Sequence, residues 1–114
     1  LVGADVLPDA QRWVLEVCQI FRNAFLQQNS FDKVDMFCVA QKQAKMLSII
    51  TNLYRQGVAN IQKGVTYLNL RKSKVIPKIA KMKSTITNDQ LAELDKIDTE
   101  MERSMERLGA IYES

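Results

Sequence analysis

The chain has 114 residues, 46% hydrophobic and 25% charged residues, a formal net charge of +3 and no histidine. This length and composition are typical of one folded domain, and they argue against global disorder and against a fibrous protein. No uncharged run exceeds nine residues, which excludes a membrane-spanning helix, and the lack of histidine excludes a histidine base, the usual catalytic triad and histidine metal ligands.

The first predicted helix covers about residues 8–27. Residues 1–7 have the composition of a loop, and their apolar stretch lacks the basic flank of a signal peptide. Pro8 followed by Asp9 suits a first helical turn. An apolar stripe at helical spacing follows, formed by Trp13, Val14, Val17, Cys18, Phe21 and Phe25. Asn29-Ser30 ends this pattern, and we expect residues 31–39 to be a connecting loop.

The second predicted helix covers about residues 40–63. Its apolar face is expected to contain Met46, Leu47, Ile50, Leu53, Tyr54, Val58 and Ile61. Gly57 should weaken this helix by about 1 kcal/mol relative to alanine. Gly64 suits its C-terminal stop.

Two further helices are predicted in the remainder of the chain. The first is a basic helix over about residues 70–83, which Pro77 should kink or restart. The second starts at Thr87 and Gln90, which have the spacing of a capping box, and its stripe is interrupted at Asp98. That stripe consists of Leu91, Leu94, Met101, Met105, Leu108 and Tyr112. No strand-like alternation persists, so the predicted fold class is all-α, a bundle of about four helices.

Charge is strongly segregated along the chain. Residues 1–35 sum to −2, residues 36–88 carry ten bases and no acid, and residues 89–114 sum to −5. A basic middle between acidic ends indicates internal charge pairing or an acidic partner. Nucleic acid is a weaker alternative, because Tyr67 is the one aromatic residue between Lys63 and Lys83 and a base-stacking surface is therefore poorly supported.

Phe31 and Phe37 stand out because they lie in a polar loop. They either pin the loop to the core, which composition favours, or form an aromatic wall for a planar ligand. The two cysteines, Cys18 and Cys38, are too few for a zinc site or a disulfide scaffold, so reduced thiols are the simplest interpretation. No phosphate-binding glycine loop and no nucleophile beside a base is present, and the residues alone indicate a non-enzymatic helical module.

The run from Phe25 to Asp35, FLQQNSFDKVD, resembles a signature of the catalytic A subunit of V-type and archaeal-type rotary ATPases. The resemblance covers residues 1–83, and the last helix fits it in kind only. Beyond the signature, further residues that resemble the family are Phe37-Cys38, Lys42-Gln43, Met46-Leu47, Tyr54, Gly64-Val65 and the stretch Ile79-Ala80-Lys81-Met82-Lys83.

The resemblance implies that residues 1–114 are the C-terminal helical domain of that subunit. The nucleotide-binding domain, with its phosphate loop, catalytic glutamate and magnesium ligands, is then expected upstream. The parent subunit would hydrolyse or synthesise ATP coupled to H⁺ or Na⁺ transport, with ATP or ADP and magnesium bound there. For this chain alone we expect no catalytic residue, no metal site and no cofactor.

Two functional regions follow from the resemblance. Phe31 and Phe37 match positions that surround the adenine ring. The loop at residues 2–11 corresponds by position to the loop that pushes on the rotating shaft in F-type enzymes, with contact residues Asp5, Val6, Leu7, Pro8 and Asp9. Cys38 matches a cysteine that in some relatives forms an inhibitory disulfide with the phosphate loop, although a structural role is the default here.

The implied partners are the upstream nucleotide-binding domain and a central-stalk subunit, together with the non-catalytic B subunit. The resemblance places the chain in the peripheral sector of a membrane complex, at its cytoplasmic face, without membrane insertion and without nucleic acid. The alternative is a free-standing helical adaptor that binds an acidic protein or nucleic acid through its basic middle segment.

Overall fold

The computed structural model describes residues 8–26, 40–86 and 90–113, which are entirely α-helical apart from one π-helical turn and short connections. The elements in these ranges are α1 (Asp9–Phe21), η2 (Arg22–Leu26), α3 (Ala40–Gln62), α4 (Tyr67–Arg71), α5 (Val75–Thr85) and α6 (Leu91–Glu113). The all-α prediction is confirmed. The described ranges contain five α-helices, one more than the four helices predicted, because the basic helix is divided in two.

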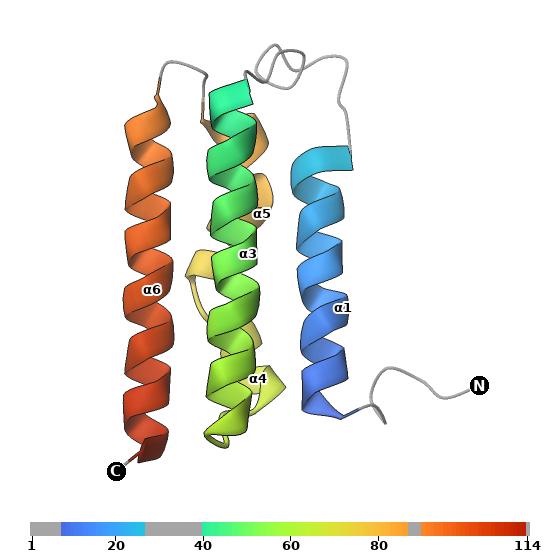
Figure 1. The fold of residues 1–114 in the computed structure, drawn as a ribbon, viewed down its shortest axis with the longest axis vertical. Helices are drawn as coiled ribbons and strands as arrows, with labels where there is room; N and C mark the ends of the chain where they lie inside the picture. The colour runs from blue at the N-terminus through green and yellow to red at the C-terminus, as the bar shows by residue number, and fades with distance from the viewer. Residues whose placement is uncertain (1–7, 27–39, 87–89, 114) are drawn as a thin grey trace, which may run out of the picture.

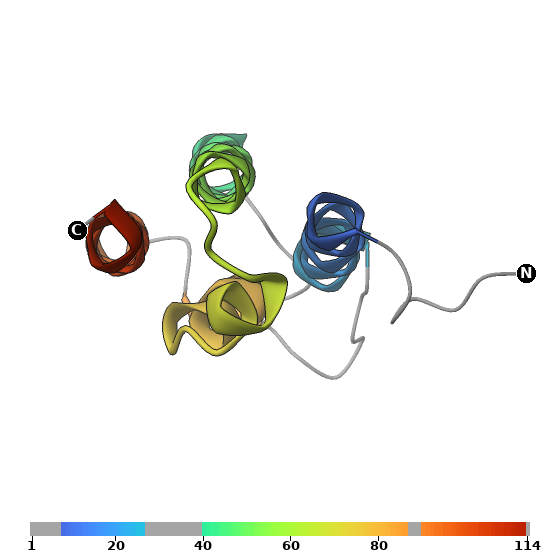
Figure 2. The ribbon, with the colours of Figure 1, turned by 90° about the horizontal axis from the view of Figure 1, so that it is seen from below.

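α3 is the central helix of the bundle. It lies between α1 and α6 (Figure 1), and the end-on view shows α4 and α5 in a second layer across this row (Figure 2). α3 and α6 run in the same direction, whereas α1 and α5 run in the opposite one. We call the end of the bundle where α1 starts and α4 lies the lower end, and the end where α3 and α6 start the upper end.

The buried rows of α1 and α3 are narrower than the sequence predicted. Val14 and Leu47 are 40% and 49% exposed, and Cys18 and Tyr54 also lie at the surface, although all four were placed in apolar stripes. Trp13 and Val17 of the first stripe and Met46, Ile50 and Leu53 of the second are buried as predicted, and the buried apolar residues outside the predicted stripes are Ile20, Ala24 and Ile49. The predicted stripes are wider than the buried faces because each helix is covered by its neighbours over only part of its circumference.

Trp13 of α1 packs directly against Gly57 of α3. The Trp13 side chain is fully buried, and its Nε1 donates a hydrogen bond to the Tyr54 carbonyl at 3.2 Å. A Cβ atom at residue 57 would overlap the indole ring. Gly57 therefore also has a packing role, because the Trp13 ring occupies the space that a side chain at residue 57 would need.

The break between α3 and α5 follows from glycine and proline chemistry. Gly64 ends α3 with φ of +105°, and the Val65 N–H donates to the Asn60 carbonyl at 3.0 Å, which confirms the predicted stop. The basic segment is interrupted at residues 72–74 and not at Pro77. Pro77 lies in the first turn of α5, where its missing N–H costs no helical hydrogen bond.

α6 confirms the predicted last helix and the gap in its stripe. Leu94, Met101 and Met105 are fully buried, and the half-buried Asp98 accepts a hydrogen bond from Asn52 at 3.3 Å. Thr87, of the predicted capping box, lies outside the described residues. Within the part of the chain that the structure describes, no helix is both long and apolar enough to cross a membrane.

Replacing Gly57 by alanine should destabilise the chain despite the better helix propensity of alanine. Propensity alone predicts a gain of about 1 kcal/mol, whereas the severe overlap with the indole should cost about 3 kcal/mol or more, which exceeds that gain. Urea unfolding followed by fluorescence of Trp13, the single tryptophan, measures the difference. Ser48→Ala, at an exposed position of the same helix, is the control and should change stability little. A Gly57→Ala variant more stable than the parent would contradict the contact.

Candidate functional site

The predicted site residues divide into those that the structure describes and those that it does not. Pro8 and Asp9 are described, at the start of α1. The others lie outside the described residues: Asp5, Val6, Leu7, Phe31, Phe37 and Cys38. For the two predicted regions, the structure therefore describes mainly the residues that flank them.

The two predicted regions flank opposite ends of one continuous helical segment. Residues 1–8 precede α1, and residues 27–39 follow η2 directly. The 13 residues of α1 and the five of η2 span about 25 Å, given about 1.5 Å per α-helical residue and less in the π-helical turn. α1 starts at the lower end of the bundle, whereas α3, which residues 27–39 precede, starts at the upper end (Figure 1).

At the lower end, Asp9 joins α1 to α4. Its Oδ2 accepts a hydrogen bond from the backbone N–H of Tyr67 at 3.0 Å, and Tyr67 is the first residue of α4. The first-turn N–H groups of a helix lack intrahelical partners, and a carboxylate there also complements the helix dipole. The Thr66 hydroxyl accepts from the Asn69 N–H at 3.3 Å and caps the same turn.

Arg12 and Tyr67 strengthen this contact between α1 and α4. The Arg12 guanidinium lies 4.5 Å from the centre of the Tyr67 ring, a cation–π geometry, and 4.0 Å from Asp9 Oδ1. One turn further along α1, Glu16 pairs with Arg71 at 3.5 Å. The Asp9 carboxylate is thus engaged within the domain, and it fixes the point at which the predicted stalk-contact loop enters α1.

At the upper end, Lys42 joins α3 to the end of α5. The side chain is fully buried, and its Nζ donates to the carbonyls of Lys83, at 2.8 Å, and Ile86. These carbonyls belong to the last turn and the C-cap of α5. This contact is not predicted from the sequence, although Lys42 precedes Met46 by four residues and so extends the buried row of α3.

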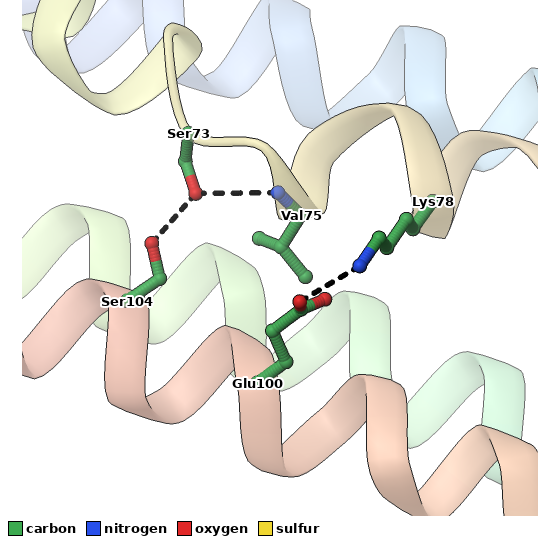
Figure 3. A network of polar contacts seen from close by, with 5 residues as sticks. All are labelled: Ser73, Val75, Lys78, Glu100 and Ser104. Atoms are coloured by element: carbon green, nitrogen blue, oxygen red, sulfur yellow. Dashed lines mark hydrogen bonds and ion pairs between the residues drawn. The ribbon is translucent and has the colours of Figure 1, made fainter.

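The basic middle of the chain pairs with the acidic last helix. Lys45 contacts Asp95 and Lys78 contacts Glu100, both at 2.8 Å, and Figure 3 shows the second pair beside the Ser73–Ser104 hydrogen bond. The predicted internal charge pairing is confirmed. Each such surface pair contributes about 0–1 kcal/mol to folding stability. The pairs therefore add little stability, and their main effect is to favour the packing of α6 against α3 and α5.

A groove of about 720 Å³ runs between α5 and α6. Its charged walls are largely neutralised, because Lys78 pairs with Glu100 across it and Lys96 pairs with Glu93. Among the described residues no cluster of three or more histidine, cysteine or acidic side chains could hold a metal ion. The groove therefore has no feature that marks it as a substrate or metal site.

Comparisons with known proteins concern the whole chain. Residues 1–71 match the family described as the C-terminal domain of V and A type ATP synthase. The chain is 38% identical over 111 residues to the A subunit of the A-type ATP synthase of Hyperthermus butylicus, and 39% identical over 114 residues to the V-type ATP synthase alpha chain of Halothermothrix orenii. These matches cover 95% and 100% of the chain but 18% and 19% of the relatives, so the chain spans less than a fifth of their length.

Removing the Asp9 carboxylate should loosen α4 from α1. We expect Asp9→Ala to lower the free energy of unfolding by about 1 kcal/mol, because it leaves a first-turn N–H of α4 without its acceptor. Asp9→Asn keeps an acceptor oxygen and should lose less. Urea unfolding of both variants measures the effect. Asp95→Ala, which removes a surface ion pair, is the matched control and should cost less than Asp9→Ala; equal losses would show that Asp9 is an ordinary surface acid.

Proposed function

The chain belongs to the family of the C-terminal domain of V and A type ATP synthase, and on this premise we propose that it links nucleotide binding to rotation in a rotary ATPase. In this proposal it follows a nucleotide-binding domain in the catalytic chain, lies beside the non-catalytic B subunit, and contacts the central stalk. The complex acts at the cytoplasmic face of a membrane. Relatives named as A-type and V-type ATP synthase subunits support the assignment.

Phe31 and Phe37 are proposed to cover the adenine ring of ATP or ADP. The phosphates and magnesium would be bound by the upstream domain, since no P-loop sequence occurs in this chain. Aromatic stacking on a base contributes about 1–3 kcal/mol, which can orient a nucleotide but cannot hold it alone. In this arrangement the chain contributes one wall of the pocket and does no chemistry itself.

Residues 5–9 are proposed to contact the central stalk. Asp9 is bound to α4 within the domain, so its role at this contact is to hold the loop, whereas Asp5, Val6 and Leu7 are left to meet the stalk. A swing of the domain on nucleotide binding and release would then move the loop against the shaft, as in hinge-type transitions.

The observation that supports the proposal is that one continuous helical segment, α1 with η2, lies between the two proposed regions in the chain. The nucleotide-facing residues 27–39 follow η2 at its end, and the stalk-facing residues precede α1 at its start. Trp13 packs α1 tightly onto α3, so the segment cannot move without the bundle. Motion at one region is therefore transmitted to the other over about 25 Å of helix.

The basic middle gives little support to the alternative of a free-standing adaptor. Three of its ten bases, Lys45, Arg71 and Lys78, make ion pairs with Asp95, Glu16 and Glu100, and a fourth, Lys42, is buried. We therefore retain the coupling domain as the proposed function.

The isolated 114-residue chain should bind ATP too weakly to saturate below about 1 mM, because stacking alone supplies less than the roughly 4 kcal/mol that such affinity requires. Isothermal titration calorimetry with ATP and magnesium measures this directly. A saturable, submicromolar affinity would show that the chain contains a complete nucleotide site, contrary to the proposal.

In the full-length protein within its complex, Phe31→Ala and Phe37→Ala should each raise the KM for ATP about tenfold, which corresponds to about 1.4 kcal/mol of lost stacking. Steady-state ATP hydrolysis measures KM and kcat. Leu15→Ala is the control, since Leu15 is exposed on α1 and lies between the two proposed regions. If both phenylalanine variants kept the KM of the parent, the adenine role would be wrong.

A further inference from the structure

Four exposed cations lie where the connection between α4 and α5 meets α6. We call them the basic cluster, and they are Lys72, Lys74, Arg103 and Arg107. The hydroxyls of Ser73 and Ser104 are hydrogen-bonded at 2.7 Å and hold the two segments together (Figure 3). Ser73 lies between the two lysines in the chain, and Ser104 lies between the two arginines. The fold thus joins cations of the basic middle to cations of the last helix, which the segregation of charge along the sequence does not reveal.

The basic cluster is not neutralised within the part of the chain that the structure describes. Cations next to it are paired, since Arg71 contacts Glu16 and Lys78 contacts Glu100. By contrast, no side chain of the basic cluster forms an ion pair or a hydrogen bond with a described residue. Like charges held close together repel each other, so this surface is stabilised when it binds an anion.

The acids of α6 near the basic cluster are directed elsewhere. Arg103 and Arg107 line a depression of about 500 Å³ along α6, and its two acids, Asp95 and Glu100, are paired with lysines of α3 and α5. Glu106 precedes Arg107 and therefore projects about 100° around the helix from it. The depression thus presents mainly positive charge to a partner.

We propose that the basic cluster is a docking site for an acidic segment of another protein subunit. Arginine binds carboxylates through two parallel hydrogen bonds, which gives such a contact a defined geometry. Arg103 and Arg107 are four residues apart, about 6 Å along α6, and this spacing matches two acids one turn apart on a partner helix. Lys72 and Lys74 add positive charge beside them. The inference uses none of the adenine-facing or stalk-facing residues, and it rests on the proposed function only for the complex in which the partner is sought.

A protein partner fits this surface better than a nucleic acid or a membrane does. Proteins bind single-stranded nucleic acids with cations together with aromatic side chains that stack on the bases. The aromatic residues nearest to the cluster in the sequence are Tyr67, which is buried, and Tyr112, whose hydroxyl accepts a hydrogen bond from Asn69. Helices that bind membrane surfaces combine cations with an apolar face, whereas the depression on α6 is lined by charged residues and Thr99.

Zero-length crosslinking with a carbodiimide tests the proposal in the assembled complex that contains the full-length protein. The reagent joins a lysine amine to a carboxylate in direct contact, and mass spectrometry of the digested complex identifies both residues. We expect Lys72 or Lys74 to be joined to an aspartate or glutamate of another subunit. The pair of Lys78 and Glu100, at 2.8 Å within the domain, is the internal control for the reaction.

Single charge reversals then measure the contribution of the cluster. Arg107→Glu should lower the yield of the intersubunit crosslinks about tenfold, because it sets like charges against each other. Arg107→Gln, which only removes the charge, should lower the yield less. Arg55→Glu, at an exposed position of α3 outside the basic cluster, is the matched control and should leave the yield unchanged. Added KCl should lower the yield in the parent, because salt screens exposed charges.

Two results of these experiments would overturn the inference. One is the Lys78–Glu100 crosslink without any intersubunit crosslink from Lys72 or Lys74. The other is an equal loss of yield in Arg55→Glu and Arg107→Glu. The full-length protein is also mixed with oligodeoxythymidine and with phosphatidylcholine vesicles that contain phosphatidylglycerol. If either binds the parent but not Arg107→Glu, and no intersubunit crosslink forms, the ligand is a nucleic acid or a membrane and the inference is wrong.

The phenylalanine variants separate this inference from the proposed function. If Phe31→Ala and Phe37→Ala leave the KM for ATP unchanged while the intersubunit crosslinks form, the adenine role fails and the docking site stands. If the KM rises and no such crosslink forms, the adenine role stands and the docking site is wrong.

Discussion

The close approach of α1 and α3 at Trp13 and Gly57 is the constraint on which the rest of the bundle depends. The indole lies where a side chain on residue 57 would be, and it also reaches the Tyr54 carbonyl. The contact fixes both the separation of the two helices and their register. Since α3 is the central helix, it thereby sets the position of α1 relative to α5 and α6, which pack on other sides of α3.

Polar contacts then fix the two ends of the second layer. Asp9 joins α1 to the start of α4, and Lys42 joins α3 to the end of α5. Each contact places a charged side chain on backbone groups that a helix terminus leaves without partners. Asp9 accepts from the N-terminal end of α4, and Lys42 donates to the C-terminal carbonyls of α5. Both charges are therefore also favourable with respect to the helix dipoles.

Sequence reasoning predicted the parts of the fold that depend on local pattern. The helix over residues 40–63, the stop at Gly64 and the paired charges all follow from periodicity, backbone freedom and charge segregation. It did not predict which residues are buried where burial depends on which neighbouring helix covers a helix face. Val14 and Leu47 continue apolar patterns yet lie at the surface, and Lys42 is charged yet buried, because burial is decided by the packing of α5 and α1 around α3. The same distinction applies to the candidate site: the family resemblance assigned Asp9 to the stalk contact, and only the structure shows its carboxylate on α4, at a residue 58 positions away.

These contacts also determine how a force would pass through the domain. A single helix between two sites can bend or rotate about its own axis, and motion at one end is then partly lost before it reaches the other. Here α1 with η2 forms one path between the ends of the bundle, and α4 with α5 forms a second. The Asp9 and Lys42 contacts lie at opposite ends of the second path, and Trp13 holds the first path to α3 between them. In the proposed coupling role, the contacts at both ends of the second path and the one on the first would oppose bending and twisting, so a displacement at the upper end would reach the lower end.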